Sequence, residues 1–102
     1  MALSDFNTDY EAVAASQTDQ VLGPGTTGTG DILERIVVTV ATSATGTCSI
    51  KDGGGSAITI TAANTPIGVY SVLIGARSTA GAWKVTTGAG ATALAIGRFK
   101  GA

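Results

Sequence analysis

Histidine is absent from the 102-residue chain, and cysteine occurs only once. Without histidine, the chain lacks histidine-dependent catalytic triads, histidine general bases and the common zinc ligand sets. A single cysteine cannot form a disulfide within the chain, whereas small secreted scaffolds usually depend on such bonds. We therefore expect Cys48 to be a small buried hydrophobic residue, in a protein that folds in a reducing cytosol.

Charged residues make up only 13% of the chain, against roughly 25% in average soluble proteins. They are divided along the sequence: residues 1–34 contain six acids and no bases, whereas residues 35–102 contain six bases and one acid. This division predicts attraction between an acidic leading segment and a basic body, within one subunit or between neighbours; the alternative is ordinary solvated surface charge. Bases scattered singly, few aromatics and a net charge of -1 argue against nucleic-acid binding.

Long apolar runs are missing as well. The longest, residues 36–41, is far shorter than a membrane-spanning helix. The first residues lack the basic and apolar regions of a secretion signal. From these features we expect neither membrane insertion nor export.

No glycine-rich or acidic segment fits a catalytic or ligand-binding motif. Residues 23–28 match G-x-G-x-x-G by letter, but a β-branched segment follows them where a dinucleotide-binding motif requires a helix. Asp31 and Glu34 are expected on opposite faces of one strand, so they cannot readily act as a carboxylate pair. Asp52 precedes three glycines without the further acids of a calcium loop, which indicates a turn. The chain is therefore predicted to be no enzyme and to bind no cofactor, metal or small-molecule substrate.

Strands joined by tight turns are favoured by the 15 glycines and by the abundant threonine, valine and isoleucine. A period of two between apolar and polar residues predicts a short segment at 20–22, strands at 32–41, 47–51, 56–61, 67–74 and 82–86, and a last strand around Leu94 and Ile96. The turn at residues 52–55 predicts a hairpin between its flanking strands. About seven or eight short strands, with turn signals roughly 8 to 12 residues apart, predict an all-β, antiparallel β-sandwich, jelly-roll-like, with a small closed barrel as the alternative.

Residues 1–19 are predicted to be an extended N-terminal arm, and residues 20–102 a single β-sandwich domain. Thr8–Glu11 matches the capping box that starts a helix, which would continue through Ala15. Because a helix of about two turns is marginal in water, we expect the arm to become ordered only against a partner. Its apolar anchors would be Phe6, Tyr10 and Val13.

Two predicted strands carry apolar residues on both faces. The strand at 67–74 has Val69 and Leu73 on one face and Tyr70, Val72 and Ile74 on the other. In the strand at 32–41, the even positions form a core row interrupted by Glu34, and the odd positions are half apolar. Since a domain of this size has one core, the second apolar faces predict burial against another polypeptide. The candidate contacts on these faces are Leu33, Val37, Tyr70 and Val72.

Trp83 is the only indole in the chain, and Arg77 and Lys84 lie near it in sequence. Aromatic and arginine side chains are favoured at contact sites, so Trp83 and Arg77 are candidates for a glycan-binding or subunit-contact platform. Trp83 also shares a strand face with Val85, which favours a plain core tryptophan. The sequence leaves both interpretations open.

The segments SQTDQVLGP at 16–24, GDILER at 30–35 and GAWKVTTGA at 81–89 together resemble the small capsid decoration, or cement, proteins of tailed bacteriophages. The likeness extends over nearly the whole chain in segment order and strand pattern. It implies a β-sandwich that sits outside the major capsid protein lattice, commonly as a homotrimer at threefold or quasi-threefold positions. It carries over no catalytic residue.

From this resemblance we expect a virion structural protein on the capsid exterior, made in the host bacterial cytoplasm. Its expected partners are the major capsid protein and further copies of itself, as a homotrimer. Neither nucleic acid nor a membrane is an expected partner. The alternative is a head-fibre or spike module that binds host-surface glycans through Trp83 and exposed loops.

Overall fold

The computed structural model describes residues 9–23, 29–43 and 45–99 of the chain. These residues form no helix and eight strands: β1 (Asp9–Val13), β2 (Gln20–Val21), β3 (Ile32–Val40), β4 (Cys48–Asp52), β5 (Ile58–Thr61), β6 (Gly68–Arg77), β7 (Trp83–Thr86) and β8 (Ala91–Arg98). All except β1 lie where the alternation of apolar and polar residues predicts a strand.

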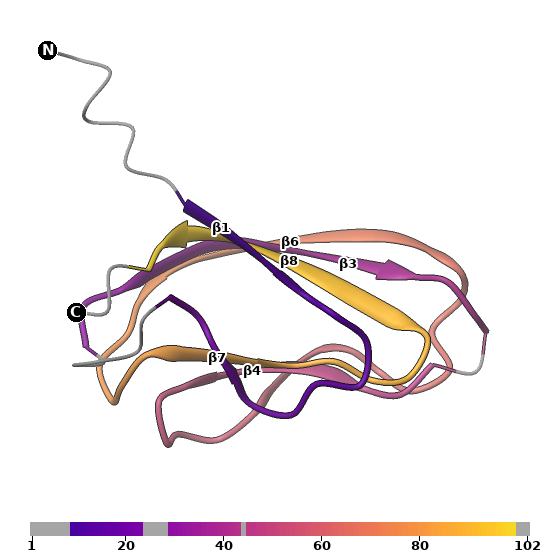
Figure 1. Cartoon of the computed structure of the whole chain (residues 1–102), viewed down its shortest axis with the longest axis horizontal. Helices are drawn as coiled ribbons and strands as arrows, with labels where there is room; N and C mark the ends of the chain where they lie inside the picture. Colours follow the sequence, from indigo (N-terminus) through magenta and orange to yellow (C-terminus); the bar gives the residue numbers. More distant parts are fainter. Residues whose placement is uncertain (1–8, 24–28, 44, 100–102) are drawn as a thin grey trace, which may run out of the picture.

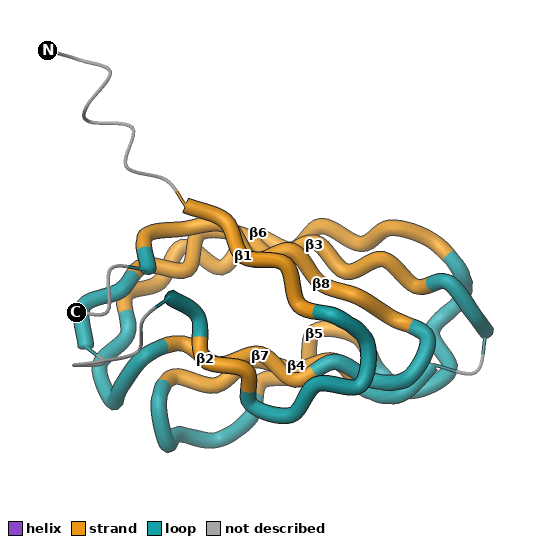
Figure 2. The backbone as a smooth tube through the Cα atoms, in the orientation of Figure 1, coloured by secondary structure: helices purple, strands orange, loops and turns teal. Residues whose placement is uncertain are grey.

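The strands form two antiparallel sheets that face each other, as Figures 1 and 2 show. Sheet A has the order β1-β8-β3-β6, and sheet B has the order β2-β7-β4-β5. The first strand pairs with the last, β1 with β8, and β2 pairs with β7. The strands from β1 to β4 alternate between the two sheets. This arrangement is that of a jelly roll. The predicted sandwich is confirmed, and each sheet ends in two edge strands rather than closing on itself. The predicted hairpin of β4 and β5 is also confirmed.

The hydrophobic core lies between the two sheets. Its members include Leu33, Ile36, Val38 and Val40 from sheet A and Cys48, Ile50, Trp83 and Val85 from sheet B. Cys48 is buried, as predicted. Trp83 is only 3% exposed, and its Nε1 donates a hydrogen bond of 3.1 Å to the carbonyl oxygen of Asp31. Because a buried indole N–H normally needs such a partner, this bond explains why Trp83 lies in the core, and the interpretation of Trp83 as a surface platform is wrong.

A β-bulge between Leu33 and Arg35 changes which side chains of β3 face the core. Against β8, Leu33 lies opposite Gly97 and Arg35 lies opposite Ile96, so Glu34 is an extra residue on β3. Glu34 and Arg35 are both exposed, and Leu33 is fully buried. The unbroken alternation assumed for residues 32–41 is therefore wrong, because the extra residue moves Leu33 to the core face.

Residues 9–13 form a strand instead of the predicted short helix. β1 pairs along its whole length with β8, from Asp9 opposite Gly97 to Val13 opposite Ala93, and Val13 is buried. The edge of β8 offers backbone partners and a place in the core, whereas a helix of about two turns has little stability of its own. Residues 9–13 thus belong to sheet A of the sandwich. Phe6 and Thr8 lie outside the described residues.

Candidate functional site

The described residues contain no grouping of three or more histidine, cysteine, aspartate or glutamate side chains that could hold a metal ion. In the same ranges, no helix has the length and apolar character needed to cross a membrane. The surface is distinguished instead by its two outer sheet faces and by two carboxylates that hold loops in place.

The outer face of sheet A carries an apolar surface that extends over all four strands. We call it the apolar face, and it consists of Tyr10 on β1, Leu94 and Ile96 on β8, Val37 on β3, and Val69 and Leu73 on β6. The register brings these residues together, because Tyr10 lies opposite Ile96 and Val37 lies opposite Leu94. Tyr10, Val69 and Leu73 are 75%, 67% and 70% exposed. Exposed apolar side chains gathered on one face of a small domain mark a candidate interaction surface.

β8 shows most clearly that the apolar face is unusual. Ala91, Ala93 and Ala95 point into the core and are buried, whereas the larger Leu94 and Ile96 point outward and are only partly covered. A strand that served the isolated domain alone would place its large apolar residues inside, where burial stabilises the fold. The reversed arrangement is expected when the outer side chains are buried by another polypeptide.

One end of the apolar face is basic. Arg77 and Arg98 lie on either side of Ile32, on the strands that flank β3, and both are exposed. Arg35 is also exposed, and its Nη1 donates a hydrogen bond of 2.6 Å to Ser71 Oγ on β6. Arg35 lies one row further in, between Ile96 and Leu73, and we call Arg35, Arg77 and Arg98 together the arginine end. Neither Arg77 nor Arg98 forms an ion pair with any residue that the structure describes.

The outer face of sheet B is polar. Its outward side chains on β4, β5 and β7 are Ser49, Lys51, Thr59, Lys84 and Thr86. Lys51 and Lys84 lie directly opposite each other on neighbouring strands. Hydroxyl and ammonium groups are well solvated, so this face needs no cover. The two faces of the sandwich therefore differ sharply in character.

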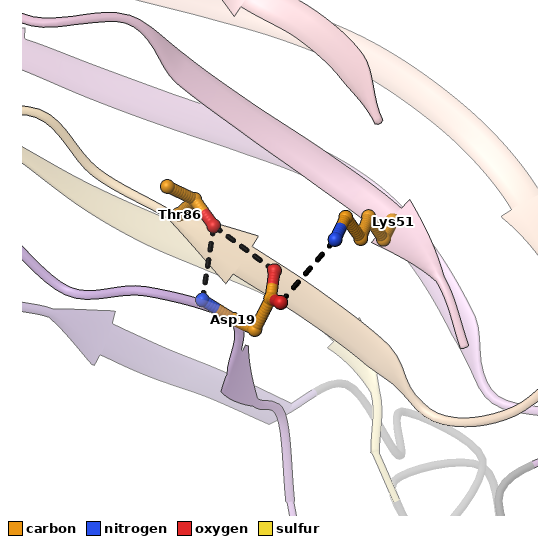
Figure 3. A network of polar contacts seen from close by, with 3 residues as sticks. All are labelled: Asp19, Lys51 and Thr86. Carbon is orange, nitrogen blue, oxygen red and sulfur yellow. Dashed lines mark hydrogen bonds and ion pairs between the residues drawn. The ribbon is translucent and has the colours of Figure 1, made fainter. Parts of the chain in front are cut away.

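Asp19 ties the crossing between β1 and β2 to sheet B, as Figure 3 shows. Its Oδ2 lies 3.2 Å from Lys51 Nζ, its Oδ1 accepts a hydrogen bond of 3.1 Å from Thr86 Oγ1, and its backbone N donates to the same hydroxyl at 2.9 Å. The hydrogen bond from Lys51 is the main reason why the pKa of Asp19 lies below its ordinary value. The predicted attraction between the acidic leading segment and the basic body thus occurs within one subunit at this pair. Its role is structural.

Asp52 holds the loop between β6 and β7. Its carboxylate accepts hydrogen bonds from Thr79 N, Thr79 Oγ1 and Ala80 N, all between 2.9 and 3.0 Å. Partial burial raises the pKa of Asp52, but the donated hydrogen bonds from Ala80 and Thr79 outweigh it, and the pKa lies below its ordinary value. The predicted turn role is therefore incomplete, because Asp52 also joins two loops far apart in sequence.

No match exists to any family model, curated protein or solved structure. The apolar face and the arginine end are therefore the features of this chain that bear on its function. The residues of both features lie on the outer face of sheet A, on strands whose other side chains point into the core.

The predicted contact residues fall into three groups. Tyr10, Val37 and Arg77 lie on the outer face of sheet A. Tyr70 and Val72 lie on the inner side of β6, where they pack against the core and remain partly exposed. The side chains with almost no exposed surface for a partner are Val13, Leu33 and Trp83. Phe6 lies outside the described residues.

Most side chains of the outer face of sheet A are not among the predicted contact residues. The missed residues are Arg35, Val69, Leu73, Leu94, Ile96 and Arg98. For Val69 and Leu73 the signal was present, since alternation placed them opposite Tyr70 and Val72. Alternation alone does not tell which of two apolar faces is inside, and the structure places Tyr70 and Val72 on the inner one.

Proposed function

We propose that this chain is a non-enzymatic virion structural protein that binds the outer surface of an assembled phage capsid lattice through the apolar face and the arginine end. The observation that carries the proposal is the outward placement of Leu94 and Ile96 above buried alanines, in the middle of a small domain. The sequence resemblance to capsid decoration proteins supports the identity of the partner. The major capsid protein is the surface against which the apolar face would be buried.

The two parts of this surface suggest a division of roles. Burial of the apolar face supplies affinity, at about 25 cal/mol for each Å² of apolar surface removed from water. The arginine end lies at the margin, where charges set orientation and association rate more than affinity. Because Arg77 and Arg98 have no acidic partner in the described chain, the complementary capsid surface is expected to present carboxylates beside an apolar patch.

Stabilisation of the lattice follows from linkage. A protein that binds only the assembled, expanded lattice stabilises it by RT ln(1 + [L]/Kd), about 2.7 kcal/mol per site at 100 times Kd. The stabilisation is repeated at every occupied site. Many modest contacts of this kind would help a shell to resist the pressure of packaged DNA.

Co-sedimentation with empty, expanded shells, assembled from the major capsid protein of the phage that encodes this chain, tests the proposal. The double variant Tyr10→Ser/Ile96→Thr removes two neighbouring apolar side chains from the docking surface. We expect its Kd to rise at least about tenfold, which corresponds to about 1.4 kcal/mol. The matched control is Val21→Thr, because Val21 is an exposed apolar residue beside Lys84 on the other sheet.

Salt dependence tests the arginine end separately. Arg77→Gln/Arg98→Gln should weaken binding at low salt and flatten its dependence on ionic strength, whereas Glu34→Gln at the same end should not weaken it. The proposal fails if wild-type protein does not sediment with the shells. It also fails if Tyr10→Ser/Ile96→Thr binds as well as Val21→Thr does.

A further inference from the structure

β6 is the one long edge strand that nothing covers in the described part of the chain. It has ten residues and pairs only with β3. The other edge strands β1, β2 and β5 have five, two and four residues. Sheet edges expose unpaired backbone N–H and C=O groups, and long apolar edges are sites at which another strand adds.

The edge of β1 is already occupied by the chain itself. Gln20 Nε2 donates hydrogen bonds to Glu11 Oε2 at 2.7 Å and to the carbonyl oxygen of Ala12 at 3.3 Å. The backbone N of Gly23 donates to Glu11 Oε1 at 2.7 Å. These contacts cover part of the β1 edge with the segment that leads into sheet B. The longer uncovered edge of sheet A in the described residues is therefore that of β6.

The hydrophobic core is open on the β6 side. Tyr70, Val72 and Ile74 point inward from β6 and pack against the core, yet each remains partly exposed. Ile60 on β5, the neighbouring edge of sheet B, is also only partly buried. At the opposite side of the sandwich, by contrast, Val13 and Leu22 are fully buried. The core is thus closed at one side and incomplete at the other.

The sequence of β6 carries none of the usual protection of an edge. Natural edge strands are blocked by charged residues, prolines or bulges. From Gly68 to Ile74 there is no charge and no proline, and Arg77 is the only charged residue of the strand. The irregularity against β3 lies at the far end, where Gly75 has a φ of 61°. The stretch from Gly68 to Ile74 is open to regular pairing.

We propose that β6 pairs antiparallel with β6 of a second copy of this chain, so that two copies of sheet A form one continuous sheet. A twofold axis beside the middle of β6 places apolar residues next to apolar residues on both faces. On the inner side, Tyr70, Val72 and Ile74 of each copy cover those of the other. The two Arg77 residues lie at opposite ends of the pair, so that no like charges meet.

The size of this contact sets its strength. The ten residues of β6, together with Ile58, Ile60 and Ile67, amount to about half of the 20 to 30 residues per side in a standard interface. The dimer is therefore expected to depend on concentration and to dissociate on dilution. It differs from the homotrimer that the sequence resemblance implies, which would need another contact surface.

Light scattering over a range of about 5 to 500 µM tests the dimer, with Val69→Lys and Thr92→Lys as matched variants. Val69 and Thr92 lie on either side of Thr39 in one row of the outer face, but Val69 is on the edge strand and Thr92 is on an inner strand. We expect wild type and Thr92→Lys to dimerise, and Val69→Lys to have a dimer dissociation constant at least about tenfold higher. If both variants lose the dimer, the copies associate face to face, and the proposal is overturned.

Cysteine cross-linking tests the pairing directly, since Cys48 is buried and leaves an introduced cysteine as the accessible thiol. Val69→Cys, Ser71→Cys and Leu73→Cys probe the strand, and Thr92→Cys is the control. Antiparallel self-pairing predicts oxidation to a covalent dimer that peaks at one of the three β6 positions and is weak at Thr92. A monomer at all concentrations, or a trimer that Val69→Lys leaves intact, overturns the proposal. Shell binding by Tyr10→Ser/Ile96→Thr is measured at concentrations below those at which the dimer forms. A failure of the dimer proposal can therefore be told apart from a failure of the capsid-binding proposal.

Discussion

Gly97 on β8 is the position at which the smallest change should have a large effect on stability. A Cβ at Gly97 would lie 2.0 Å from the carbonyl oxygen of Ile32 and 3.1 Å from the Cα of Leu33. Both contacts are with backbone atoms of β3, so no flexible side chain can move aside. Gly97→Ala forces the two central strands of sheet A apart at the bulge. We expect the free energy of unfolding to fall by about 1 to 3 kcal/mol, as for other overpacked cores.

Urea and thermal unfolding, followed by the fluorescence of Trp83, measure this loss. Trp83 is the only tryptophan and is buried, so its emission reports the opening of the core. For a domain of this size, each 1 kcal/mol lowers Tm by about 4 to 8 °C. The control is Gly54→Ala, because a Cβ at Gly54 has no atom within 4 Å and its φ is not in the left-handed region. If the two variants melt together, the close approach of β3 and β8 at Gly97 is refuted.

Two further predictions concern the bulge and the carboxylates. Leu33→Ala should lower the free energy of unfolding by about 2 to 5 kcal/mol, because Leu33 is fully buried. Glu34→Ala, at the exposed extra residue, should lower it by less than about 0.5 kcal/mol. Similar urea midpoints for the two variants would contradict the bulge. Asp19 and Asp52 have pKa values below the ordinary 3.8, so their ionised forms stabilise the fold above about pH 4, and this contribution is lost as the pH falls through the lower folded values. Asp19→Asn/Asp52→Asn should therefore lose less stability than wild type on acidification, and parallel pH curves would disprove the linkage.

The fold class and most strands followed from the sequence alone. The alternation of apolar and polar residues is local, and it identified the strands because side chains of a strand point to opposite faces in turn. The same local pattern placed Cys48 beside Ile50, and Trp83 beside Val85, on faces that do lie in the core. The hairpin of β4 and β5 also follows from the sequence, since the three consecutive glycines after Asp52 favour the positive φ angles of a hairpin turn.

The tertiary structure decided which faces are inside. The extra residue Glu34 reverses the alternation of β3, and its place depends on the pairing with β8, more than 50 residues away. Residues 9–13 become a strand because β8 offers an edge, which no local signal reports. For β6, both faces are apolar, so only the position of sheet B shows that Tyr70 and Val72 face inward and that Val69 and Leu73 face outward. Local periodicity determines that two faces differ, whereas packing between distant strands determines which of them is left for a partner.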